Sequence, residues 1–468
     1  MAVEFPASVW RDSLGQPLMS RPSLTSDLQV DVAIIGAGYT GLWTAYYLKQ
    51  NSPSLKVAVL EADSAGYGAS GRNGGWLMGS FVGDSHYLAG YQGEAFQQVK
   101  HAIQSPIAEI EQFLIRHDVD CDFIHSGNYH VAARYPEQLD SLTSTLATLY
   151  QQGFDESDYH WLQGSALDDA IKVRRGQAAI FTPHCATIHP LKLVRGLAKV
   201  VESLGGTLYE QTRVSAFGKG TVQTDQGQVK ADIIVPALEG YQGQVSQLGR
   251  YTLPVQSLLI ATAPLSDRQW QDIGLESRAT YSDAARQVTY GQRSKDNRMI
   301  FGARGGYRFG GQVQTEFDHQ SPDFAWRAKL MHDLFPSLKT VPITHGWGGT
   351  LAMARKFAPH AIFDRNNGIA LAGGYGGEGV GAANLFGRTL SDLILERDTP
   401  LSRMPWAHIS QVKQILSPWE PEPFRWLAYK LIDAVFSWEE RLCVQAKRSG
   451  IEKRTAMALA KQLEGMMH

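Results

Sequence analysis

A short apolar run followed directly by three spaced glycines constrains this chain more than any other feature. Residues 30–35 read Val-Asp-Val-Ala-Ile-Ile, a pattern typical of a strand buried on both faces. Gly36, Gly38 and Gly41 follow, and residues 39–50 have a helical pattern that ends at Asn51-Ser52-Pro53. Residues 56–60 predict a second strand, which ends at Glu61. The segment therefore predicts one βαβ unit.

The spacing of these glycines has a chemical meaning. Gly36 permits a tight turn, Gly38 lets the backbone approach a diphosphate, and Gly41 permits close packing of helix on strand. The N-terminus of the helix offers unpaired N–H donors and the positive end of its dipole. Glu61 stands where a carboxylate can accept hydrogen bonds from ribose hydroxyls. We therefore predict a dinucleotide site.

Two further glycine-rich segments favour FAD over a nicotinamide cofactor. Residues 66–75 follow Glu61 and offer small residues, amide donors and a cation, through Ser70, Arg72 and Asn73. Residues 373–381 again join a strand to a helix, whose N-terminus would stabilise negative charge on a reduced flavin. Taken alone, the first segment would also suit a flexible surface loop, and the second a tight packing turn. Together with the βαβ unit they indicate a cofactor that lies across the sheet.

The rest of the chain predicts a fold with two interleaved parts. A chain of 468 residues is too long for one simple core. We expect an α/β fold: a discontinuous Rossmann-like FAD-binding domain, an α+β substrate domain with a large mixed or antiparallel sheet, and a helical C-terminal tail. The expected divisions are an N-terminal arm over 1–27, the FAD-binding domain over 28–90, 177–241 and 350–400, the substrate domain over 91–176 and 242–349, and the helical extension over 401–468.

Composition excludes several classes of protein. A formal net charge of −2 gives no basic field for nucleic acid. The three cysteines, Cys121, Cys185 and Cys443, are far apart and form no CxxC pair, so we expect neither disulfides nor a zinc site, and the histidines have no metal-ligand spacing. The N-terminus has no signal-peptide pattern, and no apolar run is long enough for a transmembrane segment. We expect a soluble, cytoplasmic protein without a metal.

These motifs together resemble the D-amino-acid oxidase/sarcosine oxidase (DAO) superfamily of FAD enzymes, and most closely the gamma-glutamylputrescine oxidase group. The likeness covers roughly residues 28–400. The motifs that carry it are residues 31–42, 69–75, 188–194, 231–235, 299–304, 345–349 and 373–377, with Pro421-Glu422-Pro423-Phe424-Arg425 similar to an extension found in that group.

The resemblance implies a reaction and a cofactor site. A hydride passes from the C–H beside an amine to flavin N5, water hydrolyses the imine, and O2 reoxidises the flavin to give H2O2. It also implies that the backbone of Val214 lies against the adenine and that Ala237 neighbours the diphosphate. The expected cofactor residues are Gly36, Ala37, Gly38, Tyr39, Thr40, Gly41, Glu61, Ala62, Ala69, Ser70, Gly71, Arg72, Asn73, Gly74, Gly75, Val214, Ala237, Gly373, Gly374, Tyr375, Gly376, Gly379 and Val380.

The chain departs from the family pattern in three places. Where amino-acid oxidases carry a carboxylate-binding arginine, residues 346–349 read Gly-Trp-Gly-Gly, so an amine is the more suitable substrate unless Arg304 or Arg355 substitutes. No cysteine lies between Cys185 and Cys443, which predicts non-covalent FAD. Glu378 stands where the gamma-glutamylputrescine group often has histidine, which points to a different charge near the flavin.

The expected substrate residues are Tyr290, Arg304, Trp347, Tyr375 and Glu378. Aromatic residues at strand positions are also typical of a core, and Glu378 would equally suit a helix cap. The partners expected are a small amine, such as a gamma-glutamylputrescine-like compound, and O2. Two alternatives stay open: a dehydrogenase that passes electrons to a carrier, and a non-catalytic electron-transfer flavoprotein subunit. The apolar helix over 424–436 suits packing on the body or in an oligomer, and as an alternative a membrane surface.

Overall fold

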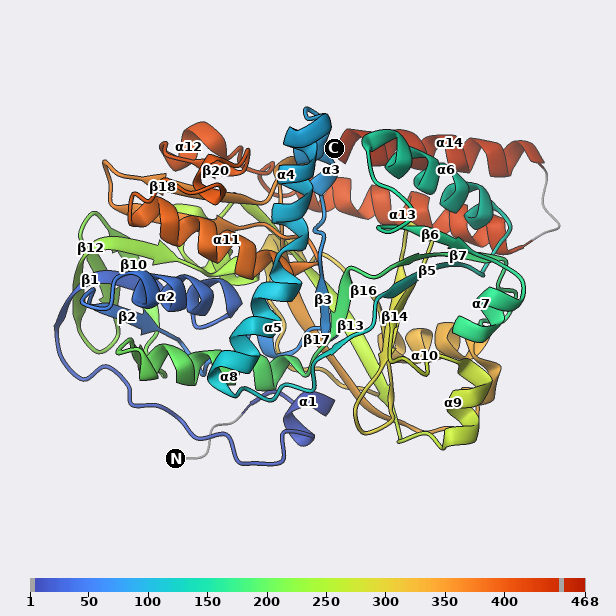
Figure 1. The fold of residues 1–468 in the computed structure, drawn as a ribbon, viewed down its shortest axis with the longest axis horizontal. Coiled ribbons are helices and arrows are strands. Elements are labelled where there is room, and N and C mark those ends of the chain that lie inside the picture. The colour runs from blue at the N-terminus through green and yellow to red at the C-terminus, as the bar shows by residue number, and fades with distance from the viewer. Residues whose placement is uncertain (1–4, 446–449, 468) are drawn as a thin grey trace.

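The computed structural model describes residues 5–445 and 450–467 of the chain. Its strands form three sheets, of nine, eight and three strands, and helices cover the two larger ones (Figure 1). In the described part of the chain no helix is both long and apolar enough to cross a membrane.

The nine-stranded sheet is built around β1 (Leu28–Ile35), which is buried between two parallel neighbours. β2 (Val57–Leu60) lies on one side of β1, and β12 (Gln228–Pro236) lies on the other. The apolar run predicted for a strand buried on both faces is therefore central in the sheet. The remaining strands are β9 (Thr207–Tyr209), β10 (Val214–Gly218), β11 (Thr221–Thr224), β18 (His360–Asp364), β19 (Ile369–Gly373) and β20 (Ala407–His408).

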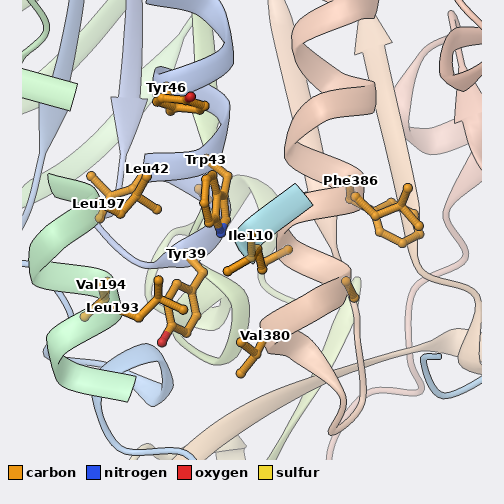
Figure 2. Packing of buried hydrophobic residues seen from close by; sticks show 14 of the residues in the cluster. Tyr39, Leu42, Trp43, Tyr46, Ile110, Leu193, Val194, Leu197, Val380 and Phe386 are labelled. Carbon is orange, nitrogen blue, oxygen red and sulfur yellow. The ribbon is translucent and has the colours of Figure 1, made fainter. Parts of the chain in front are cut away.

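Three helices pack together against this sheet. Figure 2 shows α2 (Tyr39–Asn51) between α8 (Pro190–Ser203) and α11 (Gly379–Ile394), with Trp43 and Phe386 in the buried cluster. A Cβ at Gly387 would lie 2.8 Å from Cβ of Trp43, so a glycine there allows α11 to approach α2 closely. This packing fixes the N-termini of α2 and α11 at the same edge of the sheet.

The eight-stranded sheet is mixed, as the sequence predicted. All its pairs are antiparallel except β14–β5, which is parallel. One face packs on α9 (Asp267–Ile273) and α10 (Pro322–Leu334), in a core that includes Ile260 and Phe301. In sheet order its strands are β17 (Ile343–Ala354), β13 (Thr252–Thr262), β16 (Met299–Arg304), β15 (Thr289–Arg293), β14 (Thr280–Asp283), β5 (Asn128–Ala132), β7 (Ala178–Thr182) and β6 (His160–Leu162).

The smaller elements connect or flank these layers. The three-stranded sheet contains β3 (Trp76–Met78), β8 (Cys185–Thr187) and β4 (Ile124–His125). The other α-helices are α1 (Val9–Asp12), α3 (Asp84–Leu88), α4 (Gly93–Gln104), α5 (Pro106–His117), α6 (Glu137–Gln152), α7 (Ser165–Ala170), α12 (Val412–Ile415), α13 (Phe424–Val444) and α14 (Gly450–Met467).

The predicted fold class is confirmed, and the tail is helical in α13 and α14. The predicted domain boundaries stay a prediction. Within the range given to the FAD-binding domain, β7 pairs with β5 and β6 in the eight-stranded sheet. The N-terminal arm carries α1, where the Trp10 indole N–H donates to the carbonyl of Asn73 at 2.8 Å. The arm therefore supports the glycine-rich loop at residues 66–75, which we call the second glycine-rich loop.

Candidate active site

A cavity of about 400 Å³ lies at the carboxyl ends of the central parallel strands, where Ile35, Leu60 and Ala237 line it. This is the edge at which open α/β sheets bind nucleotides. We call it the cofactor cavity. Fifteen of the expected cofactor residues line it: Gly36, Gly38, Tyr39, Thr40, Glu61, Ala62, Ala69, Ser70, Asn73, Val214, Ala237, Tyr375, Gly376, Gly379 and Val380.

The first glycine motif forms the close turn that its spacing predicted. A Cβ at Gly41 would lie 2.1 Å from the carbonyl oxygen of Gly36, so only glycine fits there. Gly36 has φ +104°, a conformation that glycine adopts readily. The backbone N–H of Tyr39, at the start of α2, donates to Oγ of Ser70 at 2.9 Å. Ser70 thus joins the second glycine-rich loop to the helix N-terminus.

Glu61 lies at one end of the cofactor cavity and is held by backbone donors. Its carboxylate accepts from the N–H of Ala37 at 2.8 Å and of Asp63 at 3.0 Å. The Glu61 carbonyl accepts from the N–H of Thr212 at 2.8 Å, which brings the segment that leads to Val214 beside it. Burial raises the pKa of Glu61 to about 7. A carboxylate fixed in this way can meet ribose hydroxyls.

Glu239, which the sequence did not single out, organises the other end of the cavity. Its carboxylate accepts from the N–H of Gly374 at 2.8 Å and of Ala352 at 3.2 Å, and burial raises its pKa to about 7. The Tyr375 hydroxyl lies 3.1 Å from Oγ1 of Thr40 in α2. These contacts fix the glycine cluster before α11. An acidic residue shortly after strand β12 was the signal that could have marked Glu239.

The chemistry of this cavity fits FAD. The N-terminal residues of two helices, α2 and α11, line one continuous space, so unpaired N–H donors and two positive dipole ends face it. A Cβ at Gly38 would lie 3.0 Å from Oγ of Ser70, so glycine keeps the approach to the N-terminus of α2 open. A diphosphate would be held by α2 and the Ser70 loop, and the flavin would lie toward α11.

A second cavity of about 420 Å³ adjoins the first, and we call it the substrate cavity. The two share part of their lining, so they lie next to each other. The shared residues are Ala69, Asn73, Leu351, Gly376, Gly377 and Val380. One face of the eight-stranded sheet forms a wall of this cavity. Side chains on a strand alternate between the two faces of a sheet, so every second residue of these strands can point into the cavity.

The polar groups of this sheet wall are mostly paired with one another. Oγ of Ser257 lies 2.6 Å from the hydroxyl of Tyr290. Nδ1 of His130 lies 2.8 Å from Oγ of Ser282, and burial lowers the pKa of His130, which favours a neutral imidazole. Tyr290 is therefore a cavity residue that also has a fixed orientation.

Two charged side chains of the substrate cavity have no polar partner among the described residues. Neither Glu378 nor Arg304 forms a side-chain hydrogen bond or ion pair with any residue that the structure describes. Glu378 stands at the N-cap position of α11 but makes no side-chain cap bond, so the alternative of a helix cap is not observed. Burial, with a smaller contribution from Asp84, raises the pKa of Glu378 to about 7. Both groups can interact with a ligand.

The remaining expected residues lie either in the other cavity than the one predicted or outside both cavities. Tyr375 lines the cofactor cavity, and Arg72 and Gly74 line the substrate cavity. Trp347 lines neither, because its fully buried indole packs in the core and donates to the Arg72 carbonyl at 2.9 Å. Six more line neither cavity and belong to the turns around them: Ala37, Gly41, Gly71, Gly75, Gly373 and Gly374.

Several lining residues were not predicted. In the cofactor cavity these include Tyr67, Thr212, Arg213, Glu239, Tyr241, Val313, Thr315 and Leu351, and in the substrate cavity Trp76, Asn128, His130, Tyr159, Thr182, Ser257, Ser282 and Met353. The substrate-cavity residues on strands point to the same face of their sheet. Alternation along each strand could have grouped them from the sequence once the strand order was known. Within residues 5–445 and 450–467, no cluster of His, Cys, Asp and Glu could hold a metal ion.

Comparisons with known proteins agree with this geometry. Residues 31–393 match the DAO family model, described as FAD dependent oxidoreductase. The chain is 28% identical over 379 residues to gamma-glutamylputrescine oxidoreductase of Escherichia coli, which covers 80% of this chain and 85% of that one. It is 29% identical over 388 residues to the probable oxidoreductase OrdL of Rhizobium meliloti, with 81% and 86% covered.

Solved structures share the fold at lower identity. Glycine oxidase from Geobacillus kaustophilus superposes with a TM-score of 0.66 at 18% identity, over 82% of this chain and all of that one. Iminodiacetate oxidase from Chelativorans sp. BNC1 gives a TM-score of 0.62 at 17% identity, over 81% of this chain and all of that one. With its two adjoining cavities and a family match over most of its length, the chain belongs to the DAO family of FAD-dependent oxidoreductases.

Proposed function

We propose that this enzyme oxidises the C–N bond of a primary or secondary amine. The observation that carries the proposal is the junction of the two cavities at Asn73, Gly376 and Gly377, where a substrate would meet the inner end of the cofactor site. FAD, when bound, would take a hydride at N5 from the carbon beside the amine, and water would hydrolyse the resulting imine. Residues of the chain bind and orient the amine there.

Glu378 suits the amine end of the substrate. An ammonium group is attracted to an unpaired carboxylate in a shielded cavity, and the amine must lose a proton before it can give up a hydride. A carboxyl group with a pKa of about 7 can accept that proton near neutral pH. We therefore assign Glu378 the roles of anchor and proton acceptor for the amine.

Arg304 suits an anionic group of the substrate. Residues 346–349 on β17 supply no arginine, whereas Arg304 at the end of β16 lines the cavity without an ion-pair partner in the described chain. Guanidinium is a good partner for a carboxylate. A gamma-glutamylputrescine-like substrate, with an amine at one end and a carboxylate at the other, fits this pair of charges. We take this compound as the example because it appears in the name of the similar protein from Escherichia coli.

Several further properties belong to the same proposal. None of the three cysteines lines either cavity, which supports non-covalent FAD. The exposed apolar residues Phe424, Leu427 and Leu431 on α13 favour an oligomer formed through the tail. A cytoplasmic location is consistent with the absence of a spanning helix in the described chain.

An anaerobic amine screen tests the proposed reaction. Purified holoenzyme would be mixed with gamma-glutamylputrescine, putrescine, sarcosine or glycine, and loss of the oxidised flavin band would be followed. We expect the fastest bleaching with gamma-glutamylputrescine. If no amine bleaches the flavin, the proposal is wrong, and the electron-transfer subunit becomes the better description.

Readmitting O2 separates an oxidase from a dehydrogenase. The oxidase assignment predicts rapid return of the oxidised band and one H2O2 per amine consumed. Slow return in air, with rapid return on adding an artificial electron acceptor, would instead identify a dehydrogenase that uses a carrier.

A further inference from the structure

The segment between β16 and α10 covers part of the cofactor cavity. Residues 305–321, which we call the cover loop, contain only a short 3-10 turn, Phe309–Gly311. Val313 and Thr315 of this loop line the cofactor cavity. The cover loop therefore forms a wall of that cavity without being part of either large sheet.

The cover loop has few attachments where it meets the cavity. Within the described chain, the carbonyl of Thr315 makes the only hydrogen bond from residues 312–316 to another segment, accepting from Nη1 of Arg72 at 3.0 Å. Nη2 of Arg72 donates to the hydroxyl of Tyr241, also at 3.0 Å. The guanidinium of Arg72 is fully buried and lies 5.4 Å from the Tyr67 ring centroid. Cover loop and second glycine-rich loop thus meet through one arginine.

The start of the cover loop pairs with β13 through Gly305 and Gly306, and the C-terminal tail then holds residues 307–310 through one carboxylate. Oε1 of Glu422 accepts from the Tyr307 hydroxyl, from the Gly310 N–H at 3.0 Å and from Nε of Arg425 at 2.9 Å. The Arg425 guanidinium lies 5.4 Å from the Tyr307 ring centroid. The ring centroids of Phe309 and Trp426 are 6.0 Å apart. The side chains of Glu422, Arg425 and Trp426 in the tail therefore interlock with Tyr307 and Phe309 in the cover loop.

The tail segment is itself anchored to the body. The Trp419 indole N–H donates to the Met353 carbonyl at 3.0 Å, and the Trp419 backbone N–H donates to the Arg250 carbonyl at 2.7 Å. Burial alone would raise the pKa of Glu422, but hydrogen bonds from Tyr307, Arg425 and Gly310 lower it below its usual range. The carboxylate stays ionised near neutral pH, so it can hold all three donors.

We propose that Glu422 is a positioning residue for FAD, which holds the cover loop against the cofactor cavity and so slows release of the cofactor. A ligand enclosed by a loop leaves when the loop opens, and opening is easier for a segment with few anchored contacts. The tail supplies those anchors from outside the family match, which ends at residue 393. The inference concerns retention of FAD and does not depend on which amine is oxidised.

The test compares release of FAD from holoenzyme of the full chain, of three single variants and of one double variant. Glu422→Gln removes the charge but keeps an acceptor oxygen, and Tyr307→Phe removes the hydroxyl that the cover loop donates to the same carboxylate. Glu420→Gln is the matched control, because Glu420 lies in the same segment but pairs with Arg355, and among the described residues it forms no hydrogen bond or ion pair with the cover loop. Release is followed as the rise of flavin fluorescence after dilution, and melting temperatures are measured with and without FAD.

We expect release to be about tenfold faster in Glu422→Gln and about threefold faster in Tyr307→Phe, with Glu420→Gln equal to the wild type. The double variant should accelerate release by less than the product of the two single effects, since both changes weaken the contact between Tyr307 and Glu422. The stabilisation that FAD gives to the melting temperature should shrink in Glu422→Gln.

Three results would overturn the inference. The first is release within twofold of the wild type in Glu422→Gln. The second is equal acceleration in Glu420→Gln, which would mean that the tail acts only through its general attachment. The third is a lower melting temperature of Glu422→Gln with unchanged stabilisation by FAD, which would make the contact purely structural. If Glu422→Gln does not fold, wild-type release in Tyr307→Phe is decisive against the proposal.

Discussion

Gly41 leaves no space for a methyl group between α2 and β1. A Cβ there would lie 2.1 Å from the Gly36 carbonyl oxygen and 3.1 Å from Cγ2 of Ile34. Gly41→Ala must push α2 away from the strand, which we expect to cost about 2 kcal/mol or more of unfolding free energy and most of the bound FAD. Measurements of melting temperature and flavin content check this prediction.

The control is Gly90→Ala, which should behave as the wild type because nothing lies within 4 Å of its added Cβ. Equal FAD content in both variants would contradict the expectation.

Glu378 should control the pH dependence of turnover. Its raised pKa of about 7 means that the carboxylate form appears as pH rises through that value. With a cationic amine we expect kcat/KM of the wild type to rise with pH through about 7. Glu378→Gln should lose that step and fall by roughly 10- to 100-fold.

The control for this prediction is Glu396→Gln, because Glu396 is exposed and pairs with Arg365. Its profile should follow the wild type. A wild-type profile that keeps its step near pH 7 in Glu378→Gln would assign the step to another group.

At the scale of single residues, sequence spacing predicts local contacts well. Gly36 and Glu61 were predicted because their partners lie within one βαβ unit. Trp347 was expected in the substrate site but faces the core, because alternation along β17 does not say what covers each face. Glu239 was missed since its partners, Ala352 and Gly374, lie more than 100 residues away.

At the scale of elements, the Glu239 carboxylate joins the glycine cluster before α11 to strand β17. Glutamine at position 239 would offer one acceptor oxygen where two N–H groups, of Gly374 and Ala352, now have separate oxygens. A buried donor left without a partner costs about 1–3 kcal/mol. Glu239→Gln should therefore weaken FAD binding by about tenfold or more.

Titration of apoprotein with FAD measures this change in dissociation constant. Glu276→Gln, at an exposed position, is the control and should bind as the wild type. Unchanged affinity in Glu239→Gln would mean that the glycine cluster keeps its place without the second oxygen.

Elements with strong local patterns were predictable, but their partners were not. The strand at 30–35 and the helix after it follow from residue type, burial pattern and glycine spacing. The pairing of β5 with β14 joins segments about 150 residues apart, as in Asn128 with Thr280. Nothing local specifies such a pair, because it depends on how the two faces of the whole sheet are covered.

At the scale of the whole molecule, the active site collects acidic groups that are costly to ionise. Burial raises the pKa of the cavity residues Glu61, Glu239 and Glu378 to about 7, and that of Asp84, which lines neither cavity, to about 6. Other carboxylates, such as Asp122 and Asp158, are ion-paired and have lowered pKa values. The cofactor cavity lies at the strand ends of one large sheet and the substrate cavity lies against the other, and burial in these cavities raises the pKa of their acidic groups.

The contrast between buried carboxyl groups with raised pKa values and ion-paired ones with lowered pKa values predicts how the stability of the apoprotein changes with pH. A carboxyl group with a raised folded pKa stabilises fully below its unfolded value of about 4.5, and that contribution is lost as pH rises through about 7. The paired carboxylates act in the opposite direction and lose their contribution only in acid. We expect the unfolding free energy of the apoprotein to be highest near pH 5 and to decline toward pH 8.

Glu378→Gln isolates one contribution to that decline, because glutamine does not ionise. Relative to the wild type, the apoprotein variant should gain stability as pH rises from 5 to 8, by up to about 3 kcal/mol for a shift of this size. Denaturant unfolding at several pH values measures the difference, and Glu276→Gln should follow the wild type throughout because its side chain is exposed. A difference between Glu378→Gln and the wild type that stays constant over this range would mean that Glu378 ionises as readily in the folded chain as in the unfolded one.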